Sequence, residues 1–205
     1  MFVTMLVTAR NRLALTLAAA ASLVLTSGCA AVSSTRPAPA VGQDAGLTAN
    51  FTAMGLSFRY PVAWRSGTWN DVSSFTALIV DLSTARLHDP CTATTSPGEE
   101  SVTCGYPVGK LPPGGILVSW DEDGFPTWHP PKTNTTIAGR RAVETRTTGG
   151  WCSSLGGTET ITVIIPRDAA DNWYQMDACL RAPGLPRQEA QVSAMLRTVR
   201  IARGD

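Results

Sequence analysis

The pattern of hydrophobic and polar positions divides the chain into three parts. Residues 13–28 are uncharged and mostly apolar, and they follow two arginines, Arg10 and Arg12. Residues 30–45, "AAVSSTRPAPAVGQDA", are small and polar with two prolines, so they cannot build a core and are typical of a flexible tether. From residue 46 onward apolar residues recur at the spacings of strands and a helix. We therefore predict a single globular domain over residues 46–205, a length that suffices for one core.

Alternation of apolar and polar residues predicts several strands within this domain. The segment 55–64, "GLSFRYPVAW", predicts a half-buried strand that ends at Pro61. Residues 74–82 are apolar on both faces, which predicts a central strand. Residues 114–124, "GGILVSWDEDG", predict a strand that runs into an Asp-Gly turn. Residues 134–148 predict two strands about a turn at 138–140, and residues 158–184 predict a hairpin with its turn at 168–172.

The period changes to that of a helix near the C-terminus. Pro186 is suited to open a helix, and Val192, Met195, Leu196 and Val199 then form one apolar stripe. We expect this stripe to pack on a sheet. An amphipathic membrane helix is the alternative, which the lack of a basic surplus on the polar face disfavours. The predicted fold class is α+β, a mainly antiparallel sheet packed by a C-terminal amphipathic helix, with a mostly-β sandwich as the alternative.

The apolar run at the N-terminus is too short for a membrane span, which needs about 20 residues. Its order of positive start, apolar middle and small residues is typical of a secretory signal. "LTSGC", residues 25–29, resembles the end of a bacterial lipoprotein signal, although Thr26 stands where that family usually has Leu. The resemblance implies a signal peptide over 1–28 and a lipidated tether over 29–45. It places the protein on the extracytoplasmic face of a bacterial cell membrane, held by lipid on Cys29. An ordinary signal peptide with an incidental cysteine and an uncleaved span are the alternatives.

Charge and cysteine content constrain the remaining 177 residues. Removal of Arg10 and Arg12 lowers Lys+Arg from 17 to 15 against 16 acids, so there is neither a basic patch for nucleic acid nor a polybasic run for anionic lipid. Four cysteines remain, and an even count in an exported chain predicts two disulfides. Of three possible pairings we favour Cys91–Cys104 and Cys152–Cys179, because each closes a local loop. The lack of a Cys-x-x-Cys motif disfavours redox and zinc chemistry.

Candidate catalytic and metal-binding patterns are sparse. The two histidines, His88 and His129, lie beside Asp89 and between prolines, and no Gly-x-Ser-x-Gly elbow accompanies them. The run Asp121-Glu122-Asp123-Gly124 lacks the spacing of a calcium loop, so we interpret it as a charged hairpin tip. Glu99-Glu100 is interpreted as a solvated loop. We predict no catalytic residue, no metal and no cofactor.

Tryptophan is the one compositional excess, with six residues in the chain. Aromatic residues on loops are efficient contact residues for proteins, peptides or sugars. We predict a possible contact surface in the segment 120–131, with core packing as the alternative. Its residues are Trp120, Phe125, Trp128 and His129.

The order of these elements resembles the PsbP-like fold, which is found in actinobacterial lipoproteins and in the extrinsic photosystem II protein. The resemblance rests on "GLSFRYPVAW", "TIAGRRAVE", the late hairpin and "EAQVSAMLRTVRI", and it covers residues 55–201. It implies an antiparallel sheet with packed helices and a role in binding or assembly. This chain departs from the family in residues 91–104 and in "DEDGFPTWHPPK".

The function expected from these observations is a non-enzymatic binding or assembly module with an envelope protein as partner. A small-molecule or cell-wall-glycan binder is the alternative, and a hydrolase with an unrecognised site is the third. No residue of a binding site follows from the family resemblance.

Overall fold

The computed structural model describes residues 47–69, 75–96, 99–124, 132–167 and 172–202. These residues belong to one compact unit that runs from Ala40 to Asp205. The predicted signal peptide, the tether and Cys29 lie outside the described residues. Within the described part of the chain, no helix has the length and apolar character needed to cross a membrane.

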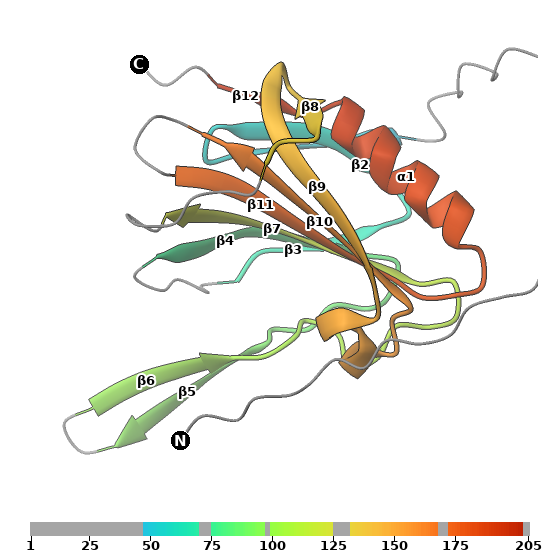
Figure 1. Cartoon of the computed structure of the whole chain (residues 1–205). Helices are drawn as coiled ribbons and strands as arrows, with labels where there is room; N and C mark the ends of the chain where they lie inside the picture. The colour runs from blue at the N-terminus through green and yellow to red at the C-terminus, as the bar shows by residue number, and fades with distance from the viewer. Residues whose placement is uncertain (1–46, 70–74, 97–98, 125–131, 168–171, 203–205) are drawn as a thin grey trace, which may run out of the picture. The chain divides into compact units, whose positions relative to one another are not determined.

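A seven-stranded antiparallel sheet forms the centre of the unit (Figure 1). Each neighbouring pair runs antiparallel, and long stretches of register are continuous across the middle strands. In spatial order the strands are β3 (Arg65–Gly67), β4 (Thr76–Ser83), β7 (Ile116–Gly124), β11 (Asn172–Leu180), β10 (Glu159–Pro166), β9 (Arg140–Thr148) and β8 (Thr135–Ile137).

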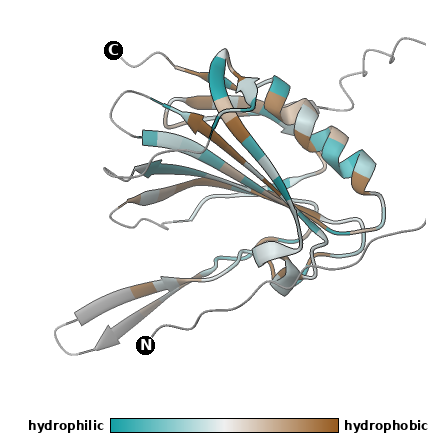
Figure 2. Cartoon of the chain, in the orientation of Figure 1, coloured by the Kyte–Doolittle hydropathy of each residue, from teal (hydrophilic) through white to brown (hydrophobic). Residues whose placement is uncertain are grey.

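One face of this sheet is covered by a small sheet and by the helix. The small sheet has the order β1 (Leu47–Ala53), β2 (Leu56–Pro61), β12 (Arg200–Ile201), and the helix is α1 (Leu185–Arg197). Hydrophobic and hydrophilic residues alternate along α1 in Figure 2. The buried side of α1 carries Val192, Met195 and Leu196, which join one hydrophobic cluster with apolar residues of β2, β4, β7, β10 and β11. This cluster is the main core of the domain.

The strand and helix predictions are largely confirmed. Strand β2 ends at Pro61 as predicted, and α1 begins at Leu185, one residue before Pro186. The predicted turn between the β8 and β9 strands lies at Ala138 and Gly139, both with positive φ. The structure is thus mainly antiparallel β with one short α-helix. Strand β1 and the 3₁₀ helix η1 (Gly150–Leu155) are elements that the sequence pattern did not indicate.

Two predictions about acidic segments are wrong. Strand β7 continues through Gly124, so residues 121–123 lie within a strand that pairs with both β4 and β11, and not at a hairpin tip. Glu99 and Glu100 begin β6 (Glu99–Cys104), which pairs with β5 (Cys91–Ser96). Backbone pairing places both segments in strands, with partners on both sides for β7 and with β5 for β6.

The opposite face of the seven-stranded sheet is only partly covered, and we call it the open face. At one end of it, the segment 105–115 and η1 enclose a second, smaller hydrophobic cluster that includes Leu117, Leu155 and the Cys152–Cys179 pair. Both predicted disulfides, Cys91–Cys104 and Cys152–Cys179, are present. The first joins the first residue of β5 to the last residue of β6, and the second joins η1 to β11.

Candidate functional site

A row of carboxylates crosses the open face, and it arises from strand register. Asp81 of β4 and Asp177 of β11 both pair with Ser119 of β7. Because side chains alternate along a strand, residues at matched positions point to the same face, and Asp121 is the next residue of β7 on that face. Neighbouring strands lie about 4.8 Å apart, so Asp81 and Asp177 are separated by about 10 Å between backbones. The three carboxylates therefore lie on one face of three neighbouring strands.

The Asp81 carboxylate is held by two donors. Ser119 Oγ donates to Asp81 Oδ1 at 2.6 Å, and Trp69 Nε1 donates to Asp81 Oδ2 at 2.9 Å. The indole ring reaches β4 because it passes directly over Gly67, where a Cβ would lie 2.5 Å from the ring atom Cζ2. Asp81 is only 2% exposed, so both hydrogen bonds offset its loss of solvation. These contacts fix the position of the carboxylate.

The Asp177 carboxylate is held in the same way from the other side. Thr162 Oγ1 donates to Asp177 Oδ1, and Gln175 Nε2 donates to Asp177 Oδ2 at 2.8 Å. Each donor comes from the same strand or the adjacent one. Two acidic groups are thus oriented by neighbours before any ligand arrives, which lowers the entropic cost of binding.

Two aromatic side chains form a wall beside this acidic row. The rings of Tyr106 and Trp151 stack with centroids 5.4 Å apart and planes 19° apart. Tyr106 belongs to the segment after β6 and Trp151 to η1. Leu111 N donates to Leu155 O at 3.0 Å, which joins the same two segments through their backbones. The stacked pair is therefore anchored on both sides.

Together these groups enclose a recess of about 270 Å³, which we call the acidic recess. Its floor is formed by the sheet residues Leu78, Asp81, Ser119, Asp121 and Asp177. Its wall is formed by Pro90, Gly105, Tyr106, Pro107 and Trp151.

Each disulfide holds one part of that wall. Cys152 follows Trp151 directly, and its bond to Cys179 attaches η1 to β11, two residues from Asp177. Cys91 and Cys104 directly adjoin the wall residues Pro90 and Gly105, whose backbones are also joined, since Gly105 N donates to Pro90 O at 2.9 Å. Each disulfide therefore stabilises one part of the recess wall.

The recess favours a ligand that is positive and rich in hydrogen-bond donors. No lysine or arginine lines it within the described residues, whereas three carboxylates do. Carboxylates accept hydrogen bonds, and an aromatic face attracts cations through its quadrupole. The volume is close to the lower end of the range for small-molecule sites, so it fits a compact group.

A fourth carboxylate, Asp123, lies beyond Asp121 on the same strand. Its pKa is raised, mainly because the side chain is buried at 7% exposure and also because Asp177 is nearby. Hydrogen bonds from Thr76 and Trp173 oppose this shift by stabilising the charged form. Burial is thus the main cause of the raised pKa, and the Asp177 charge adds a smaller contribution.

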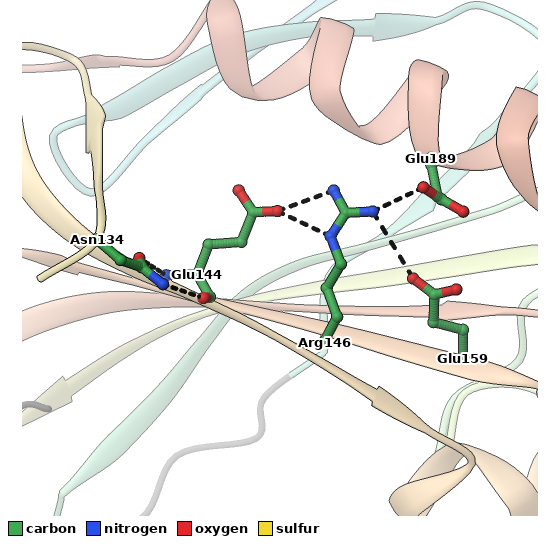
Figure 3. Close-up of polar contacts among 5 residues, drawn as sticks. All are labelled: Asn134, Glu144, Arg146, Glu159 and Glu189. Atoms are coloured by element: carbon green, nitrogen blue, oxygen red, sulfur yellow. Dashed lines mark hydrogen bonds and ion pairs between the residues drawn. The ribbon is translucent and has the colours of Figure 1, made fainter. Parts of the chain in front are cut away.

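A separate charged cluster lies on the other side of the sheet, between β9, β10 and α1 (Figure 3). The Arg146 guanidinium contacts Glu144 at 2.9 Å and Glu189 at 2.6 Å, and a Glu159 oxygen lies 3.9 Å away. Hydrogen bonding to Glu144 is the main cause that raises the pKa of Arg146. Since Glu189 belongs to α1 and the other groups to the sheet, this cluster attaches the helix to the sheet. We interpret it as structural.

The predicted contact surface of Trp120, Phe125, Trp128 and His129 is wrong for Trp120. That side chain is fully buried in the main core and stacks on Phe58 with ring centroids 5.3 Å apart. Phe125, Trp128 and His129 lie outside the described residues. The alternation of β7 places Trp120 on the covered face and Asp121 on the open face, which explains the outcome.

The other candidate residues do not join the recess. His88 is exposed and does not line it, and Asp89 accepts a hydrogen bond from Cys91 N at 2.9 Å in a local turn. Among the described residues, no group of three His, Cys, Asp or Glu side chains has a geometry for holding a metal ion. Sequence reasoning missed the recess because its floor comes from three strands distant in the chain.

Comparison with known proteins assigns no family to the chain. No family model matches the sequence, and no curated protein matches it significantly.

Proposed function

We propose that this chain is a lipid-anchored bacterial envelope protein whose PsbP-like domain binds a small ligand carrying a protonated amine in the acidic recess. The anchoring part rests on the lipoprotein-like segment that ends at Cys29. The PsbP-like part is supported by the antiparallel sheet and by a C-terminal helix that leads into a short strand.

The observation that carries the binding proposal is the set of three carboxylates in one aromatic-walled recess. Two of them are fixed by described donors. A positively charged ligand is attracted to all three. This favours ligand binding over a flat surface for protein assembly, the other role that we considered. The hydrolase alternative has no supporting contact among the described residues.

Paired ligands in which a neutral group replaces the protonated amine test this proposal. Thermal unfolding is measured with glucosamine against N-acetylglucosamine and with butylamine against butanol. A ligand at 100 times its Kd stabilises the folded state by about 2.7 kcal/mol, which raises Tm by about 5 to 10 °C for a domain of this size. We expect the shift with the amines alone.

Asp121→Asn is the matching variant, because it removes one charge of the recess without removing a side chain. A charge about 4 Å from the ligand contributes about 1 kcal/mol even at the dielectric constant of water, so binding should weaken at least about fivefold. Glu189→Gln on α1 is the control, since it removes the same charge on the other side of the sheet. Equal shifts with the neutral analogues would support the glycan alternative. No shift with any compound would refute binding at the recess.

A further inference from the structure

A second hollow, of about 580 Å³, lies between the small sheet and the C-terminal end of α1. Three arginines line it and come from three elements: Arg59 of β2, Arg197 at the end of α1, and Arg200 of β12. Within the described residues no carboxylate lines this hollow. We call it the arginine groove.

Strand register explains why the three arginines converge. Arg200 pairs with Ser57 across the β2–β12 ladder, and Arg59 is two residues further along β2, so Arg59 and Arg200 are diagonal neighbours on one face. Thr198 fixes the helix end against this ladder. Its Oγ1 accepts from Arg59 N at 2.8 Å and donates to Met195 O at 2.7 Å.

The chemistry of the groove is suited to an anion with several oxygens. All three arginine side chains are exposed at their positions, and a guanidinium presents a planar set of donors that matches phosphate oxygens. The hydroxyl group of Ser57 lines the same hollow and can donate as well, whereas Thr52 Oγ1 donates to Phe51 O at 2.9 Å. The negative charge of one carboxylate would balance only part of the positive charge of the three guanidinium groups. A phosphoryl group offers them more acceptor oxygens than a carboxylate does.

We propose that the arginine groove binds a phosphoryl group. This inference does not depend on the acidic recess. Two sources share the chemistry, a free phosphate-bearing solute and a phospholipid headgroup. The headgroup is within reach if the anchor proposal holds, because β1 borders the groove and begins 18 residues after Cys29. A random coil of that length, as expected of the tether from its composition, has a root-mean-square span of about 20 to 25 Å.

The test measures how fast phenylglyoxal modifies each arginine, with mass spectrometry to identify the sites. The full chain, purified from bacterial cells in detergent, is titrated with inorganic phosphate. The same protein is then reconstituted in vesicles of phosphatidylcholine alone or with added phosphatidylglycerol. We expect modification of Arg59, Arg197 and Arg200 to slow at least fivefold in one of the two arms, while that of Arg141 and Arg187 stays unchanged.

Variants show whether the three arginines act together. In Arg197→Gln/Arg200→Gln, the protection of Arg59 should disappear, since each arginine near an anionic surface contributes about fivefold and two contribute about 30-fold. Arg141→Gln/Arg187→Gln has the same net charge, leaves the groove intact and should keep the protection. Circular dichroism checks that both variants fold.

The arms separate the possible outcomes. Protection by phosphate in detergent supports a solute site, and protection only with phosphatidylglycerol supports a headgroup site. Protection by neither, or equal protection in the Arg197→Gln/Arg200→Gln variant, would overturn the proposal. A protein that carries no lipid can still show protection by inorganic phosphate. Failure of the anchor proposal can therefore be distinguished from failure of the groove proposal.

Discussion

Removal of the Cys152–Cys179 disulfide should destabilise the whole domain. The two cysteines are 27 residues apart, and the chain-entropy model assigns such a cross-link about 3.5 kcal/mol of stabilisation, by a mechanism that is model-dependent. Both side chains are fully buried in the second hydrophobic cluster, so Cys152→Ala/Cys179→Ala also loses packing. We expect Tm to fall by about 7 to 14 °C.

The other disulfide provides the control because its surroundings differ. Cys91 and Cys104 are 13 residues apart, for which the same model gives about 3 kcal/mol. Strands β5 and β6, however, contact chiefly each other, as their extension away from the sheet in Figure 1 also shows. Without the bond, this hairpin can open while the core stays folded. The folded state then gains much of the conformational entropy that the unfolded state gains, so the two gains largely cancel. The global free energy of unfolding should change by less than about 1 kcal/mol.

Urea unfolding followed by circular dichroism measures the free energy of global unfolding. Hydrogen exchange measures the local opening of the β5–β6 hairpin. Faster exchange confined to β5 and β6 is expected for Cys91→Ala/Cys104→Ala, whereas Cys152→Ala/Cys179→Ala should lower the urea midpoint. Equal losses of free energy for the two pairs would refute the distinction between a detached hairpin and a bond to the central sheet.

Three further changes have defined outcomes. Asp123→Asn should raise stability at neutral pH. The folded-state pKa of Asp123 is raised, so the free energy of unfolding of the native protein falls as pH rises from about 4 through that pKa. Denaturation measured as a function of pH should show this fall for the native protein and not for Asp123→Asn. Arg146→Gln should cost about 1 kcal/mol at low salt in urea unfolding, since its partners are partly exposed, and high salt should reduce the loss. A loss that salt leaves unchanged would contradict an electrostatic role. Gly157→Ala places a Cβ 2.4 Å from Cys152 Sγ, so we expect the free energy of unfolding, measured by thermal denaturation, to fall by more than about 1 kcal/mol. The loss should shrink in the Cys152→Ala/Cys179→Ala background, and additive losses would argue against a clash with the disulfide.

Local patterns predicted much of the fold. Alternation identified β2 and the β10–β11 hairpin, and the stripe from Val192 to Val199 identified the helix and its buried side. The disulfide pairing followed from loop length, because short loops close most easily. These signals lie within a few residues of each other along the chain.

The candidate site could not be predicted, because it depends on pairing between distant segments. Asp81 and Asp177 meet only through the β4–β7–β11 order, and the Trp69 hydrogen bond needs the absent side chain of Gly67. Asp121 belongs to a run that suggests a turn, yet the ladder with β4 and β11 continues through it. The three arginines of the groove likewise are separated by up to 141 positions, from Arg59 to Arg200, and no local basic run signals them.

The formal net charge of the chain, +1, conceals a separation of charge within the domain. Carboxylates gather on the open face of the large sheet, and guanidinium groups gather where the small sheet meets the end of α1. Such a molecule has a dipole moment. A charged surface therefore exerts little net electrostatic force on the molecule but does exert a torque. The orientation of the molecule, and the direction in which each site faces, then varies with ionic strength.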